Sequence, residues 1–307
     1  MANNPWRLLI ISTLALFITA CDESTDKTNN KAAPVSSVQT QINDKFTAFI
    51  KAANSEASVN FHLLPEALYQ YQREIEPKLK SNQPLTSYSV INPTILRTVS
   101  QRLAEGLSLP GPIPQLDLAA QAYKASLDAL IPLSETLYAY QQNKGWLTDN
   151  GELARRNDTA YVTDFTTLVM KRDGFLKAIS VANSQRIKLA YEQSPPDSAE
   201  HYRNGLVYLS RQTLQELTHN RTSEEEAALN EHIVTLSQLA SGWNTLLQQQ
   251  SNKSCEKIIT TANDYIAALH AAMAEQSQGE EIPEEKEENI VLPFNALVQA
   301  LNSYRSC

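Results

Sequence analysis

Few residues of this chain have the type and spacing that chemistry requires. None of the five histidines lies two to four residues from another histidine or from a cysteine, the short spacing at which metal ligands commonly occur. These histidines are His62, His201, His219, His232 and His270. Glycine-rich phosphate loops, the G-x-S-x-G nucleophile motif and the H-E-x-x-H zinc motif are also absent from the sequence. We therefore expect no metal, no cofactor and no catalytic residue, and a protein that is not an enzyme.

One polar cluster lies at a turn that precedes a long helical segment. It consists of Asp149, Glu152, Arg155, Arg156 and Asp158. Such a group could bind a ligand, but carboxylates in the first turn of a helix also stabilise its N-terminus. We favour the structural interpretation.

A second polar cluster, Glu200 to Arg203, includes His201 and is the densest on any expected helix. It could form one wall of a binding site, or it could be a half-buried helix start with solvated charges, which is the interpretation that we favour. Tyr138 and Tyr140 similarly fit either a recognition surface or the rim of a core. The six glutamates between residues 280 and 288 could attract cations or a basic partner, although a solvated loop is the simpler interpretation.

Cys21 has the context of a lipidation site. Residues 1–20 begin with a polar stretch that carries Arg7 and continue with about thirteen mostly apolar residues, a layout typical of a secretory signal. The apolar run is shorter than the roughly 20 residues that cross a bilayer. The tetrapeptide Ile18-Thr19-Ala20-Cys21 looks like a bacterial lipobox, in which the cysteine is acylated and becomes the mature N-terminus. The alternative is an ordinary cleaved signal with a chance cysteine.

The residues after Cys21 predict a tethered protein of the cell envelope. Asp22 resembles the sorting signal that keeps lipoproteins on the inner membrane of enteric-type bacteria, and residues 22–37 are polar and free of aromatic residues, as in a flexible tether. One acyl chain such as palmitate holds a protein only marginally, whereas the two or three chains of bacterial lipoproteins anchor it stably. We expect a body in the periplasm that is held to the membrane by lipid.

Cys255 and Cys307 are the two cysteines that remain if Cys21 is lipidated. An even pair in an oxidising compartment predicts a disulfide. Cys255 lies at the start of one expected helix and Cys307 lies just past the last one, so antiparallel packing would bring them together. Two unpaired thiols, or a dimer bridged through Cys307, remain as alternatives.

The charge of the chain argues against nucleic acid as a partner. The 307 residues carry a formal net charge of −8, and loss of residues 1–20 with Arg7 would make it −9. An acidic body is not attracted to phosphates or to anionic lipid.

The elements that must position these residues are helices. Glycine is scarce, with eight in the chain, and apolar residues recur at helical spacing with no convincing strand pattern. Helices are expected over 37–60, 61–79, 94–107, 116–142, 152–193, 199–217, 224–250, 253–276 and 292–304.

Two helix starts have recognisable signals. Pro65 either kinks a helix or lies in its first turn, and Ser223 with Glu226 fits a capping box. We predict an all-α fold, an elongated bundle of long antiparallel helices, with a single domain over 38–307.

Residues 116–150 carry a family resemblance. The stretch LDLAAQAYKASLDALIPLSETLYAYQQNKGWLTDN places Tyr123 on an Ala-rich helix, Tyr138 and Tyr140 near its end, and Asp149 at a turn. It resembles the central stretch of the YiiG-like bacterial lipoproteins, whose shared domain has unknown function, and residues 199–217 and LPFNALVQALNSYRS resemble later helices of that family. The resemblance implies a helical fold and a lipid anchor, and it brings no catalytic residues.

The residues are compatible with three functions. The first is a non-enzymatic envelope lipoprotein that uses a helical surface to bind an envelope protein or the cell wall. The second is a periplasmic protein that binds a small molecule or metal between its helices. The third, a hydrolase, is the weakest because no nucleophile and base pair is visible.

Overall fold

The structure is a computed structural model that describes residues 37–55, 64–81, 84–217, 221–249, 255–275, 284–304 and 307. The predicted lipidation site Cys21 and sorting residue Asp22 lie outside these residues. Every regular element in the described ranges is a helix, which confirms the predicted all-α fold.

The chain divides into two compact units, residues 1–182 and 183–307. The border falls inside α7 (Glu152–Gln193), a helix of 42 residues. The sequence predicted one helical domain over 38–307, because no clear linker in the middle of the chain separates two domains.

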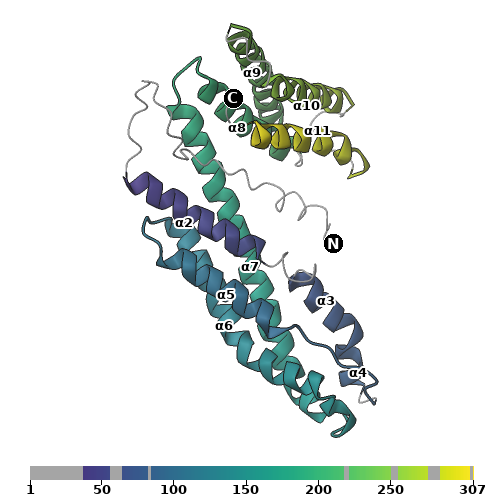
Figure 1. Cartoon of the computed structure of the whole chain (residues 1–307). Helices are drawn as coiled ribbons and strands as arrows, with labels where there is room; N and C mark the ends of the chain where they lie inside the picture. Colours follow the sequence, from purple (N-terminus) through teal and green to yellow (C-terminus); the bar gives the residue numbers. More distant parts are fainter. Residues whose placement is uncertain are drawn as a thin grey trace. The chain divides into compact units, whose positions relative to one another are not determined.

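The first unit contains a long helical pair, α5 and α6, with α2 packed on α5 (Figure 1). Its elements before α7 are α2 (Ser37–Asn54), α3 (Leu64–Glu74), α4 (Glu76–Lys80), α5 (Pro93–Ser108), α6 (Pro114–Gln142) and the 3₁₀ turn η1 (Gly145–Leu147). The helices α5 and α6 both begin with proline, whose missing N–H costs nothing at the first helical position.

The first part of α7 completes the core of this unit. The Phe175 ring of α7 contacts the Phe49 ring of α2 at 5.9 Å between centroids and the Tyr123 ring of α6 at 5.6 Å. All three side chains are fully buried. Aromatic burial of this kind contributes more stabilisation than any local helix preference.

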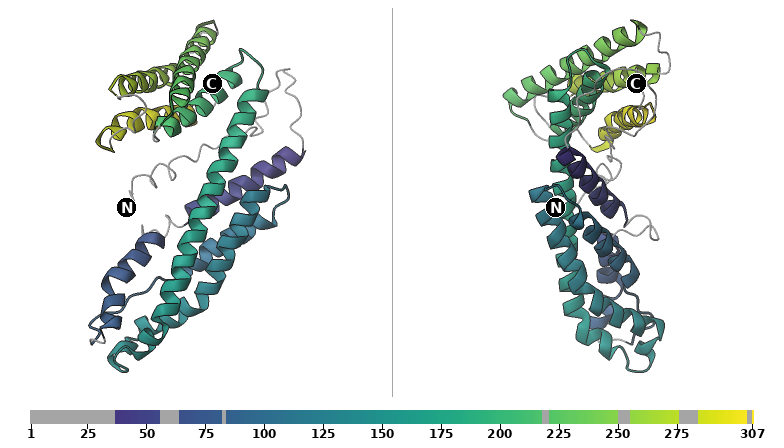
Figure 2. Two further views of the ribbon diagram at one scale, coloured as in Figure 1. Left: turned by 180° about the vertical axis from the view of Figure 1, so that it is seen from behind. Right: turned by 60° about the vertical axis from the view of Figure 1, so that its left-hand side comes forward.

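The second unit combines the end of α7 with four further helices. These are α8 (Ala199–Leu217), α9 (Ser223–Gln249), α10 (Glu256–Glu275) and α11 (Glu284–Ser303). The helix α8 packs on α9, α9 on α10, and α10 on α11, as the green to yellow ribbons of Figure 2 show. At the centre, the fully buried Tyr265 ring of α10 contacts Phe294 of α11, and its hydroxyl donates to the carbonyl of Ser210 on α8 at 2.9 Å.

Three local predictions need correction or refinement. Pro65 lies in the first turn of α3, where proline is tolerated. The capping box that opens α9 is formed by Thr222 and Glu225, not by Ser223 and Glu226: the Thr222 N–H donates to Glu225 Oε2 at 2.7 Å, and the Glu225 N–H donates to Thr222 Oγ1 at 3.3 Å. The last helix begins at Glu284, about two turns before the predicted start at residue 292.

Candidate functional site

The polar cluster predicted at the start of α7 joins a larger group of buried rings in the first unit. We call this group the tyrosine–aspartate cluster. It consists of Tyr71, Tyr88, Tyr140, Trp146, Asp149, Asp158 and Tyr161. The side chains come from α3, α6, η1, α7 and the connections that precede α5 and α7, so the fold gathers residues that are far apart in the sequence.

Asp149 caps the N-terminus of α7. Its Oδ1 accepts hydrogen bonds from the Tyr140 hydroxyl at 2.5 Å and the Gly151 N–H at 2.9 Å, and its Oδ2 accepts from the Leu153 N–H at 3.1 Å. Partial burial alone would raise the pKa of this carboxyl, but these hydrogen bonds outweigh it and hold the pKa below its usual value. The structural interpretation of this residue is therefore confirmed.

Asp158 lies nine residues after Asp149, in the second turn of α7, and faces the core. It is 6% exposed, and its Oδ1 accepts a hydrogen bond from the Tyr71 hydroxyl at 2.8 Å. Burial raises the pKa of Asp158 above its usual value, although the hydrogen bond from Tyr71 acts in the opposite direction. Burial also raises the pKa of Tyr71, with Tyr88 and Asp158 adding to the effect, so the phenol keeps its proton and remains a donor.

The remaining charged members of the predicted cluster do not join this site. Glu152 and Arg156 are exposed on the outer side of α7. Arg155 turns back toward the preceding segments, where its Nε donates to the carbonyl of Leu79 at 3.3 Å and its Nη1 donates to the carbonyl of Asn150. The structure thus separates the cluster into a buried structural part and a solvated part.

Among the described residues, two buried polar atoms of the tyrosine–aspartate cluster have no hydrogen-bond partner of good geometry. They are the Tyr88 hydroxyl and the Trp146 Nε1. Burial raises the pKa of Tyr88, and the nearby Tyr71 hydroxyl has a smaller effect in the opposite direction. The two rings lie 6.2 Å apart, and both contact the ring of Tyr140. The carboxylates of the cluster accept hydrogen bonds from phenols and backbone N–H groups, so these contacts stabilise a junction between helices.

The second predicted cluster, at the start of α8, also serves helix packing. The His201 N–H donates to the Ser198 hydroxyl at 3.0 Å, which caps the helix, and the His201 ring lies 4.8 Å from that of Tyr191. The Tyr202 hydroxyl donates to Asp197 Oδ1 at 3.1 Å. These contacts support the interpretation of a half-buried helix start.

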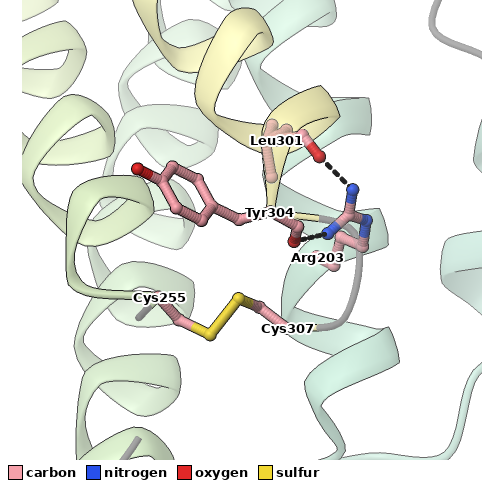
Figure 3. Close-up of a disulfide and its surroundings, with 5 residues drawn as sticks. All are labelled: Arg203, Cys255, Leu301, Tyr304 and Cys307. Carbon is pink, nitrogen blue, oxygen red and sulfur yellow. Dashed lines mark hydrogen bonds between the residues drawn. A yellow bond between two sulfur atoms is a disulfide. The ribbon is translucent and has the colours of Figure 1, made fainter. Parts of the chain in front are cut away.

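Arg203 from the same cluster connects α8 to the end of α11. Its Nη1 donates to the carbonyl of Tyr304 at 3.1 Å and its Nη2 donates to the carbonyl of Leu301. Figure 3 shows the guanidinium directed at these two carbonyls, beside the disulfide that joins Cys255 to Cys307. The structure therefore contains the disulfide that the sequence predicted, with Cys255 fully buried at the start of α10.

A buried arginine was missed by the sequence analysis. Arg211 of α8 is 7% exposed, and its Nε and Nη1 have no hydrogen-bond partner. A single arginine in a helical pattern carries no signal of burial, because arginine is normally a surface residue.

The described part of the chain contains no group of three or more His, Cys, Asp or Glu side chains that could hold a metal ion. Among the same residues, no helix combines the length and the apolar character that a membrane span requires.

Comparison with protein families gives one match. The model of a family described as a protein of unknown function, DUF3829, matches residues 40–300. In comparisons with curated proteins and with solved structures, no chain matches.

Proposed function

Because the chain belongs to the DUF3829 family of proteins of unknown function, we propose a function from its own residues: a non-enzymatic lipoprotein of the bacterial cell envelope that binds a basic partner protein. Its second unit would present the binding surface. The YiiG-like character and the lipid anchor are part of this proposal.

The division of charge between the two units is the observation that carries the proposal. Residues 1–182 contain 17 Lys and Arg against 17 Asp and Glu, whereas residues 183–307 contain 9 against 17. The whole net charge of −8 therefore belongs to the second unit. Such a one-sided distribution attracts partners of opposite charge and speeds their association.

Burial makes the surface of the second unit more acidic than the count suggests. Arg203 donates to backbone carbonyls and Arg211 is buried, so neither places its charge fully in solvent. Exposed carboxylates, in contrast, occur along several helices and turns: Glu192, Asp197, Glu200, Glu224, Glu225, Glu231, Glu256, Asp264 and Glu288. This surface is polar, which fits a reversible partner better than a permanent apolar interface.

The anchor in this proposal is acylated Cys21, with Asp22 favouring retention on the inner membrane. The support is the register of the apolar run, the small residue Ala20 and the cysteine. A lipid anchor would hold the acidic unit in the periplasm next to the membrane, where it could meet envelope proteins.

A capture experiment tests the interaction. The mature body, residues 22–307 with an affinity tag in place of the lipid, would be incubated with envelope extract, and bound proteins would be identified by mass spectrometry at low and high salt. The test variant is Glu224→Gln/Glu231→Gln/Asp264→Asn in the second unit. The matched control is Glu66→Gln/Glu74→Gln/Glu105→Gln, which removes three exposed carboxylates from the first unit.

The proposal expects a basic protein that the wild type and the control capture at low salt, and that the test variant and high salt release. Equal capture by the test variant and the control, or no basic protein enriched over an unrelated acidic protein, would contradict it.

A second candidate function is the binding of a small molecule between helices. The specific observation that favours it is the buried Arg211, whose Nε and Nη1 have no hydrogen-bond partner among the described residues.

A further inference from the structure

The guanidinium of Arg211 is buried, and no ion pair to it occurs among the residues that the structure describes. Arg211 lies in the second half of α8, it is 7% exposed, and neither Nε nor Nη1 has a hydrogen-bond partner. Burial lowers its pKa to about 10, so the group is still protonated at neutral pH. Buried charges in proteins are normally paired, because an isolated one strongly destabilises the folded state.

The surrounding unit makes this absence of a partner unusual. Residues 183–307 contain 17 Asp and Glu, and no described ion pair joins any of them to Arg211. By comparison, Glu216 on the same helix lies 3.0 Å from His232 Nδ1, so carboxylates within this unit do find partners. Among the carboxylates that the structure describes in this unit, none neutralises the positive charge of Arg211.

The helical register of α7 and α8 brings a second buried polar atom, from Asn183, toward the level of Arg211. Asn183 of α7 is 5% exposed, and its Oδ1 has no hydrogen-bond partner. The pairing of α7 with α8 is fixed near the turn, where Asn204 Nδ2 donates to the carbonyl of Ala190 at 3.1 Å. Asn183 precedes Ala190 by seven residues and Arg211 follows Asn204 by seven. Seven residues are two helical turns, so in an antiparallel pair both residues return to the facing sides at one level.

The packing of the two helices supports this register. A Cβ atom at Gly205 of α8 would lie 2.8 Å from the Tyr191 ring of α7, so the missing side chain lets the helices approach closely. The Tyr191 and Tyr208 rings stack at 6.0 Å. Asn183 and Ile187 are buried one helical turn apart near this end of α7, and Ser194, just after the helix, is buried as well.

We propose that Arg211 and Asn183 form a binding site for a small oxyanion that also carries a hydrogen-bond donor. The guanidinium donates to carboxylate or phosphate oxygens, which are its preferred partners. The Asn183 Oδ1 accepts from a hydroxyl or amino group of the same ligand. Hydroxy acids, amino acids and hydrogenphosphate have this combination. The site rests on the second candidate function and is independent of the lipid anchor and of the acidic surface.

Thermal unfolding of the full chain, purified in detergent, tests the site. Lactate, propionate and inorganic phosphate would each be titrated at constant ionic strength, with chloride as the reference anion. Lactate and propionate are a matched pair, since they differ in the hydroxyl that Asn183 would bind. The proposal expects a saturable rise in the unfolding midpoint with lactate or phosphate. Where lactate binds, propionate should need roughly fivefold more for half saturation, as for one lost hydrogen bond.

Arg211→Met should abolish the saturable rise, whereas Lys188→Met, which removes an exposed cation from α7 in the same unit, should keep it. Without any added oxyanion, Arg211→Met should unfold at a midpoint roughly 3 °C or more above wild type, because it removes an uncompensated buried charge. If Arg211→Met does not fold, Arg211→Lys replaces it and should raise the half-saturating concentration at least about tenfold.

No saturable rise with lactate or phosphate, or a full rise in the Arg211 variant, would overturn the site. Equal half saturation by lactate and propionate would overturn the role of Asn183. Neither result would affect the capture experiment with the acidic surface, so the two proposals can fail separately.

Discussion

Asp149 and Asp158 occupy opposite electrostatic environments at the start of one helix. Asp149 accepts three hydrogen bonds, two of them from backbone N–H groups, and its pKa falls below the usual value. Asp158 is buried with one phenol as donor, and its pKa rises. The same residue type therefore stabilises the folded state at one position and carries a cost at the other when ionised.

Replacement of Asp149 by Asn should destabilise the protein at neutral pH. Asn keeps only one acceptor oxygen, so it cannot accept the hydrogen bond from Leu153 together with those from Tyr140 and Gly151. We therefore expect a loss of about 1 kcal/mol in the free energy of unfolding. Since the folded pKa is depressed, this stability is fully present above the unfolded pKa of about 3.9 and is lost as the pH falls through the folded pKa. Denaturant titrations between pH 2.5 and 7 measure it. Glu152→Gln, an exposed change in the same turn, is the control; an equal loss in the control would refute the capping role.

Replacement of Asp158 by Asn should have the opposite effect. Its Oδ1 can still accept from Tyr71, while the charge that burial disfavours is gone. Because the folded pKa is raised, wild type loses stability as the pH rises from the unfolded pKa of about 3.9 through the folded pKa. Asp158→Asn should therefore be more stable than wild type at pH 7, with no difference below about pH 3. A variant that is less stable than wild type across this range would show that the carboxylate is itself stabilising.

At the scale of elements, two interactions fix the C-terminal end of α11 in the second unit. The disulfide joins the start of α10 to the residue that follows α11, and Arg203 from α8 binds the last carbonyls of α11 (Figure 3). Helix ends leave such carbonyls without partners, and side-chain donors satisfy them.

The disulfide should contribute about 4 kcal/mol to the free energy of unfolding, because it closes a span of 52 residues. Alkylation of the unreduced protein followed by mass spectrometry should detect no free thiol at Cys255 or Cys307. Reducing agent should lower the unfolding midpoint of wild type and leave a Cys255→Ser/Cys307→Ser variant unchanged. Two alkylatable thiols per monomer, or a dimer that reduction collapses, would contradict the intramolecular bridge.

Long periodic helices could be predicted from the sequence, and their ends less well. The helix over 152–193 was predicted with the bounds that α7 has, because its apolar period is unbroken and a proline pair follows it. The start of α9 was misplaced by one residue, since Thr222–Glu225 and Ser223–Glu226 fit the capping pattern equally and only backbone geometry distinguishes them. The start of α11 was placed too late, because its first turns have no apolar period, although glutamate is a good helix former.

Apart from the disulfide, which the number and positions of the cysteines predicted, the sites were predictable only where their cause is local. Asp149 precedes a helix, and a carboxylate at that position has a known local role. The contact of Asp158 with Tyr71 joins residues 87 apart, and the burial of Arg211 depends on packing between helices, so neither leaves a pattern in the sequence.

At the scale of the molecule, charge and anchor belong to different parts of the chain. The excess of acidic over basic residues lies within residues 183–307. The proposed lipid is attached near the other end of the sequence, at Cys21. Residues 22–37, which are polar and free of aromatic residues, would connect the anchor to the helices. In this account the lipid anchor holds the protein at the membrane, and the second unit binds the partner protein.

The most direct test of the account is metabolic labelling with an alkyne fatty acid, combined with membrane fractionation, of wild type and Cys21→Ser. The account predicts that wild type is labelled and stays with membranes after a salt wash, and that Cys21→Ser is unlabelled and is either soluble or unprocessed. Separation of inner and outer membranes on a sucrose gradient should place wild type with the inner membrane, as Asp22 predicts. A Cys21→Ser protein that is still labelled, or that is processed and still fractionates with membranes after the wash, would contradict the account.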